Sequence, residues 1–120
     1  MVEFALVLPV LLVVLFGIIQ FGLTLRNYVT LTDAVRAGAR TAAVSRLLQP
    51  GARTTAIDQK IQSASSDLSP SIASSDITIT STWQYGDDVS VTATYPYSIS
   101  LFGVVIASGN LSSTTTERVE

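Results

Sequence analysis

The chain has 120 residues, which is room for one small domain, and a formal net charge of −2. It contains no cysteine and no histidine. Disulfides, thiol nucleophiles, the usual zinc sites and imidazole acid–base chemistry are therefore excluded. The nearly balanced charge gives no bulk electrostatic basis for binding nucleic acid, so we expect no nucleic-acid partner.

The first part of the chain, residues 1–25, is the most distinctive. Every residue from Phe4 to Leu25 is uncharged, and only Gln20 and Thr24 are polar. A helix needs roughly 20 apolar residues to span a bilayer, so this run is long enough. It is too long for the apolar region of a secretory signal peptide, and no small-residue cleavage site follows it. We therefore expect a retained transmembrane or filament-core helix segment over residues 1–25.

This apolar segment contains one proline and two glycines. Pro9 predicts a kink or a short unwound stretch, which neighbouring helices make tolerable in a membrane. Gly17 and Gly22 are small contact points at which another helix can approach closely, although their spacing is not that of a GxxxG motif.

The helix is predicted to continue beyond the apolar segment. From Tyr28 to Leu47 apolar residues recur at steps of three to five, close to the helical period. Gly38 lies in a stretch of small residues that permits close helix contact. Gln49-Pro50-Gly51 ends the pattern. We expect one helix over about residues 3–48, longer than a bilayer is thick, so that its second half stands outside the membrane.

The rest of the sequence predicts a short helix followed by three strands. Residues 54–68 have an apolar helical face with threonine at the start. Period-two alternation then predicts two strands around a turn at Gln84–Asp87, and a run of β-branched residues predicts a third. The expected strands cover about residues 76–83, 88–95 and 111–119.

The segment between the second and third strands is predicted to be a connection. Pro96 ends the second strand or marks a sheet edge. Residues 97–106 are then an apolar, packed connection, and residues 107–110 form a turn. The predicted fold class is α+β: a long N-terminal helix with a short helix and a small three-stranded antiparallel sheet on its upper half.

Glu3 is the one charge at the apolar end of the chain. It has two interpretations. It can lie solvated at the membrane interface, favoured there by the helix dipole. Alternatively it pairs with a positive group of a neighbouring subunit, most simply that subunit's N-terminal amine, and sets the axial register of an assembly.

Arginines are concentrated before residue 54, and Arg26, Arg36 and Arg40 lie mostly off the apolar stripe. They are either a solvated helix flank or partners for inter-subunit salt bridges. Positive charge just past a span normally marks the cytoplasmic side, which would place the following domain inside the cell. The candidate acidic partners are Asp58, Asp67, Asp76, Asp87 and Asp88.

No catalytic constellation is present, so we expect no enzyme activity and no cofactor. Lys60 is the only lysine, and no Ser-x-x-Lys motif accompanies it. Asp87 and Asp88 are too few for a metal cage and suit a turn. Asn110 begins a glycosylation sequon, Asn-Leu-Ser, in an exposed Ser/Thr-rich stretch.

Several stretches of the chain resemble a known family. The run VEFALVLPVLLVVLFGIIQFG, followed by AVRAGARTAAV, resembles the TadE-like pseudopilins of the tight-adherence (Tad) branch of type IV pili. The closing LSSTTTERVE looks like the common closing strand of that family, and YPYS resembles its strand-end motif. The resemblance implies a type IV pilin-like fold in which residues 26–120 form an extracytoplasmic domain.

The same resemblance implies a function, a location and partners. It implies a pilin or pseudopilin that polymerises into a homo-oligomeric helical filament at the bacterial cell surface, for adhesion, from a pool in the inner membrane. Its partners are a prepilin peptidase, which removes a short basic leader that sets the orientation, and the Tad assembly machinery. The alternative is a single-pass membrane-anchored accessory protein or a minor initiating pseudopilin of a Tad-type secretion system.

The resemblance also assigns Glu3 as the family acid near the mature N-terminus. The family usually keeps four residues between the cleavage point and this glutamate, whereas only Met1 and Val2 precede Glu3 here. Either the start lies two residues inside the mature chain or the processing differs.

Overall fold

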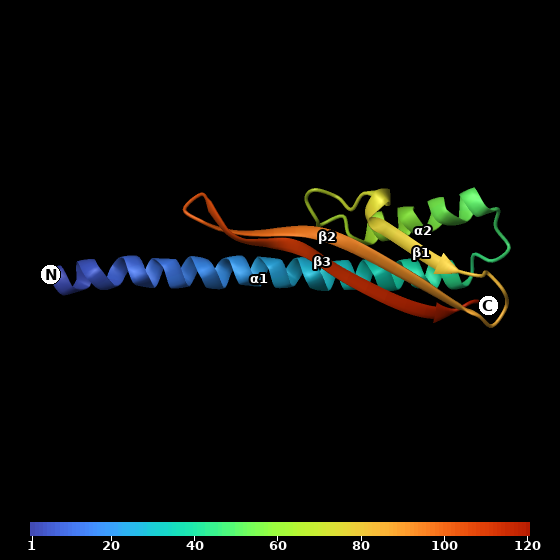
Figure 1. Ribbon diagram of the computed structural model, residues 1–120, viewed down its shortest axis with the longest axis horizontal. Coiled ribbons are helices and arrows are strands. Elements are labelled where there is room, and N and C mark those ends of the chain that lie inside the picture. Colours follow the sequence, from blue (N-terminus) through green and yellow to red (C-terminus); the bar gives the residue numbers. More distant parts are fainter.

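The computed structural model describes residues 1–120 and shows an elongated molecule of 71 × 21 × 18 Å. One long helix runs most of its length, and the remaining elements form a head on the half farther from the N-terminus (Figure 1). The predicted α+β, pilin-like fold is confirmed. Its elements are α1 (Val2–Ala43), α2 (Pro50–Ala64), the 3₁₀ helix η1 (Ser74–Asp76), β1 (Ile77–Ser81), β2 (Asp88–Leu101) and β3 (Val104–Arg118).

Helix α1 differs from its prediction at two points. It passes through Pro9 without interruption, so the predicted unwound stretch is not observed. It also ends at Ala43 instead of near residue 48. The Ala43 carbonyl accepts a hydrogen bond from the Glu120 backbone N–H at 2.9 Å, and this non-local bond takes the place of continuing the helical ladder.

Helix α2 begins and ends four residues earlier than predicted. Pro50 occupies the first turn, where a missing N–H costs nothing and the fixed φ suits the helix. Thr54 and Thr55 do not cap the helix. Their hydroxyls donate to the Gly51 carbonyl, at 3.0 and 2.9 Å, within the first turn.

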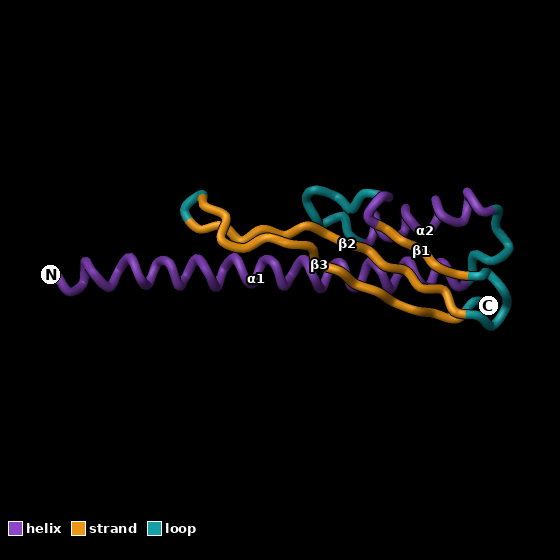
Figure 2. Tube along the Cα trace, viewed as in Figure 1, coloured by secondary structure: helices purple, strands orange, loops and turns teal.

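The sheet is antiparallel with the order β1-β2-β3 (Figure 2). Alternate residues of β2, including Val89 and Val91, are buried against α1, as the period-two pattern predicts. On the opposite face, hydroxyl groups pair across strands: Ser90 with Thr116 and Thr92 with Thr114, each at 2.8 Å.

The predicted apolar connection and turn after the second strand are wrong. Strands β2 and β3 continue as one hairpin, and its two-residue turn is Phe102–Gly103 rather than residues 107–110. Pro96 lies inside β2 opposite Asn110, beyond the last residue of β2 that pairs with β1, so the edge interpretation of Pro96 holds.

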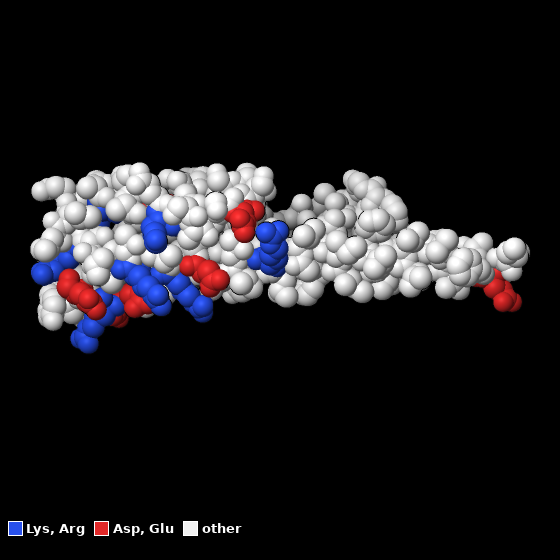
Figure 3. Space-filling model, turned by 180° about the vertical axis from the view of Figure 1, so that it is seen from behind, with Lys and Arg blue, Asp and Glu red and all other residues white.

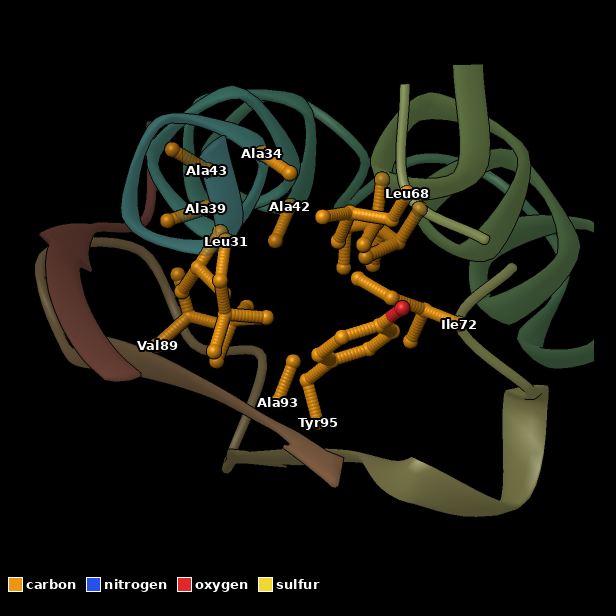
Figure 4. Close-up of a cluster of buried hydrophobic side chains, with 14 of the residues drawn as sticks. Leu31, Ala34, Ala39, Ala42, Ala43, Leu68, Ile72, Val89, Ala93 and Tyr95 are labelled. Carbon is orange, nitrogen blue, oxygen red and sulfur yellow. The ribbon is translucent and has the colours of Figure 1, made fainter. Parts of the chain in front are cut away.

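The hydrophobic core lies only in the head, between the last turns of α1, helix α2 and the inner face of the sheet (Figure 4). Small residues on α1 make this possible. A Cβ added to Gly38 would lie 2.5 Å from Cγ1 and 2.7 Å from Cδ1 of Ile61. The close approach of α2 to α1 therefore depends on a glycine at this position. The core consists of Leu31, Ala34, Val35, Ala39, Ala42, Ala43, Ile57, Ile61, Leu68, Ile72, Val89, Val91, Ala93, Tyr95 and Val119.

Arg53 holds the connection between α1 and α2 in place. Its guanidinium donates to the backbone carbonyls of Ser45 at 3.1 Å, Arg46 at 2.8 Å and Leu48 at 2.9 Å. It also stacks 4.1 Å from the ring centroid of Trp83, which has a positive φ of 59°. One side chain thus satisfies carbonyls after α1 and covers the strained residue that follows β1.

Replacing Gly38 by alanine is expected to destabilise the head. The new methyl group forces Ile61 to shift, and overpacking typically costs about 1–3 kcal/mol. Gly51→Ala is the control, because nothing lies within 4 Å of a Cβ there and the gain in helix propensity is up to about 1 kcal/mol. Thermal unfolding of the full chain in detergent measures both. Equal melting temperatures for the two variants would contradict the close-approach argument.

Replacing Arg53 by lysine is expected to lower stability by about 1–3 kcal/mol, since an ammonium cannot reproduce a planar fork that contacts three carbonyls and an aromatic ring. Near-ultraviolet circular dichroism of Trp83 reports on the same contact during unfolding. Arg40→Lys, at an exposed position without such contacts, should leave the denaturation midpoint in place. If Arg53→Lys and Arg40→Lys have the same denaturation midpoint, Arg53 does not hold the connection between α1 and α2 in place.

Candidate assembly surface

The part of α1 before Leu31 exposes an apolar surface. No residue before Leu31 is buried, and large side chains are open all around the helix; Phe4 is 69% and Ile18 65% exposed. By length and composition α1 can cross a membrane. Apolar surface of this extent is unfavourable in water, so it must meet lipid or other protein.

Charge is confined to the head, with one exception. The space-filling view shows charged side chains over the head. The other half of the molecule is uncharged, apart from one acidic group at its far end (Figure 3). That group is Glu3, the only charged side chain before Arg26. Glu3 lies exposed in the first turn of α1, where the helix dipole favours an acid, and forms neither of the two salt bridges in the chain. Its pairing with a neighbouring subunit stays a prediction.

The predicted contact glycines have different surroundings. Gly38 packs against Ile61 inside the head, whereas a Cβ added to Gly17 or Gly22 would have nothing within 4 Å. Gly38 is therefore used for packing within the chain. Gly17 and Gly22 lie on the open part of α1, where only another molecule can use them.

The predicted arginines pair partly within the chain. Arg26 lies 3.6 Å from Asp67, and Arg36 lies 3.6 Å from Asp33 one turn earlier. All four side chains are more than half exposed, and exposed pairs of this kind contribute little to stability. Arg40 forms neither pair. Inter-subunit bridges through these arginines stay a prediction.

Two further predicted positions lie on the head's surface. Asn110 is exposed in β3, so the sequon is accessible, and its glycosylation stays a prediction. Asp87 accepts a hydrogen bond from the Thr82 hydroxyl at 2.5 Å beside the turn at Tyr85–Gly86. This bond gives the Asp87 carboxylate a local role in the turn.

One feature next to the apolar helix has no signal in the sequence. The β2–β3 hairpin extends beyond the head and lies along α1 toward the N-terminus (Figure 1, Figure 2). At its turn, the ring of Phe102 packs edge-on against Phe16, with 5.8 Å between the centroids. No local pattern predicted this contact, because residues 97–106 resemble a packed connection.

The arrangement defines a class of protein: a pilin-like chain with an exposed apolar helix and a small α+β head. Residues 1–40 match the family model described as TadE-like protein, so the resemblance is confirmed for this segment. No curated protein and no solved structure matches the chain. The matching family is a pilus-related structural or accessory family, and the match with the apolar helix indicates a protein associated with the Tad pilus.

Replacing Gly22 by leucine is expected to leave the head's melting temperature unchanged, because Gly22 is exposed and nothing lies within 4 Å of a Cβ there. The same change should weaken contact with a neighbouring helix, since small residues allow close approach of helices in apolar surroundings. Unfolding in detergent and filament yield from cells measure the two effects. A reduced melting temperature would show that the N-terminal half of α1 affects the stability of the head. An unchanged filament yield would show that Gly22 does not contact a neighbouring helix.

Proposed function

We propose that this chain is a structural subunit, a pilin or pseudopilin, of a Tad-type pilus, and that it polymerises through residues 1–25. One observation carries the proposal: the first half of a continuous helix is apolar and contains no buried residue, with only the β2–β3 hairpin beside it, while its second half holds a folded head. A simple anchor has no need of a rigid helix that continues into the head, whereas a filament built on packed helices does.

The apolar surface gives the driving force for assembly. Before assembly, residues 1–25 lie in the inner membrane. During assembly they move from lipid to the packed helices of neighbouring subunits, so the apolar surface stays out of water in both states. The head, with its hydroxyl-lined sheet face, then lies on the outside of the filament and provides the surface for adhesion.

The partners follow from this proposal. A prepilin peptidase processes the chain next to the apolar segment, and the Tad assembly machinery withdraws the subunit from the membrane. Glu3 gives the assembly its specificity, because a carboxylate carried into an apolar environment is stable only when it is paired. A neighbour's N-terminal amine supplies that partner and fixes the axial register.

The second candidate function is a membrane-anchored accessory protein or a minor initiating pseudopilin of the same system. It is favoured by the length and apolar composition of α1, which suffice for a membrane-spanning helix without a neighbouring subunit. It differs from the first candidate in predicting that the chain stays with the membrane and forms no extended polymer.

Replacement of Glu3 by glutamine or alanine tests the proposed assembly. Insertion into the membrane should be unaffected, because removing a charge does not hinder it, while filament yield should fall at least about tenfold, corresponding to about 1.4 kcal/mol or more. Glu3→Asp keeps the charge and is the control. Filaments are quantified in sheared material, and insertion by resistance to alkaline extraction. Normal yield from Glu3→Gln would exclude the pairing role.

A further inference from the structure

The tip of the β2–β3 hairpin, residues Leu101–Ile106, shares the environment of the apolar helix. Phe102 at the turn contacts Phe16, which lies well inside the apolar segment of α1. The hairpin thus reaches past the head to a level at which α1 is surrounded by lipid in the membrane-inserted state of the proposed function (Figure 1).

The hairpin tip is apolar on both of its faces. Val104, Val105 and Ile106 are 65%, 58% and 60% exposed, and successive strand residues point to opposite faces. A strand with one face toward water alternates apolar and polar residues, as β2 does in the head. No charged residue lies between Asp88 and Glu117. Both faces of the tip are therefore suited to an apolar environment.

The turn of the hairpin has an aromatic residue in a backbone conformation that such residues rarely adopt. Phe102 and Gly103 have φ values of 50° and 83°, so both central residues of the two-residue turn are left-handed. Such turns strongly prefer asparagine or aspartate before the glycine. Here an aromatic residue holds the strained position, and its side chain is 73% exposed at the extreme end of the hairpin. Strain of this kind is an indicator of a functional constraint.

On α1 and on the β2–β3 hairpin, polar residues give way to apolar ones at about the same position along the helix axis. A cleft between α1 and the hairpin is lined by Gln20, Thr24 and Asn27 on one side and by Tyr97 and Ser98 on the other. The Arg26–Asp67 pair belongs to this polar level as well. Phe16 lies four residues before Gln20, which is about 6 Å along the helix. Polar groups with tyrosine mark the head-group region of a bilayer, and beyond it both elements are apolar except for Ser100.

We propose that Leu101–Ile106 inserts into the membrane leaflet nearest the head, as a second lipid contact beside α1. The shallow depth matters, because the free edges of a two-stranded hairpin cannot be satisfied deep in hydrocarbon. At this level the strands remain near hydrated head groups and only the turn and its neighbours enter the apolar region. The contact fixes the depth of α1 in the membrane, and polymerisation must withdraw it together with the helix.

The absence of cysteine in the chain allows a direct test with single-cysteine variants. Val105→Cys in the tip, Leu12→Cys in α1 and Tyr85→Cys at the opposite end of the head are each labelled with an environment-sensitive fluorophore. The full chain is reconstituted in vesicles of phosphatidylethanolamine and phosphatidylglycerol that contain spin-labelled lipid. The labels at 12 and 105 should be quenched at least about twofold, and the label at 85 should not.

Phe102→Asn separates membrane contact from folding. Asparagine suits the left-handed turn, so the turn itself should be at least as stable, while loss of the ring should reduce quenching of the label at position 105. Unchanged quenching in Phe102→Asn would show that the ring does not hold the tip in lipid, and would overturn that part of the proposal.

The remaining outcomes are also decisive. A quenched label at 12 with an unquenched label at 105 overturns the hairpin contact and leaves the proposed function standing. If neither label is quenched, α1 does not span the membrane, and both proposals fail. A label at 105 that is open to water in vesicles and protected only in filaments would assign the tip to a second copy of the chain instead of lipid.

Discussion

The constraint on which this structure depends is that α1 cannot be covered by its own chain. The head buries only the last turns of the helix, from Leu31 onward, and the preceding apolar residues are not buried, although the β2–β3 hairpin lies along one side of them. Because exposure of such a surface to water is unfavourable, the isolated chain is incomplete. Lipid or neighbouring subunits must cover the apolar part of α1. The function of the molecule depends on which of the two surrounds the helix before and after assembly.

The head is organised to hold a rigid helix with few residues. Gly38 and the alanines beside it let α2 and the sheet approach α1 closely, so a small core is dense. Arg53 and the backbone bond from Glu120 to Ala43 secure the end of α1. A head attached in this way transmits force to the helix as one body, which suits a subunit that is extracted from a membrane and built into a polymer.

Sequence patterns predicted the elements but not the contacts between distant segments. The apolar run, the period-two strands and the small-residue stretch follow from local rules and were correct in kind. The early end of α1 coincides with a backbone bond from the distant Glu120, and the Phe102–Gly103 turn lacks the usual turn chemistry, so neither has a local signal. The same holds for the candidate surface: Glu3, Gly17 and Gly22 could be named from sequence, whereas the approach of Phe102 to Phe16 could not.

Electron microscopy of material sheared from cells that produce this chain, with mass spectrometry of any filaments, tests the central claim most directly. We expect uniform thin filaments that contain this chain, with an N-terminal peptide that begins close to Glu3. A chain that remains in the membrane fraction, with no filament containing it, would contradict the claim and favour a membrane-anchored accessory protein.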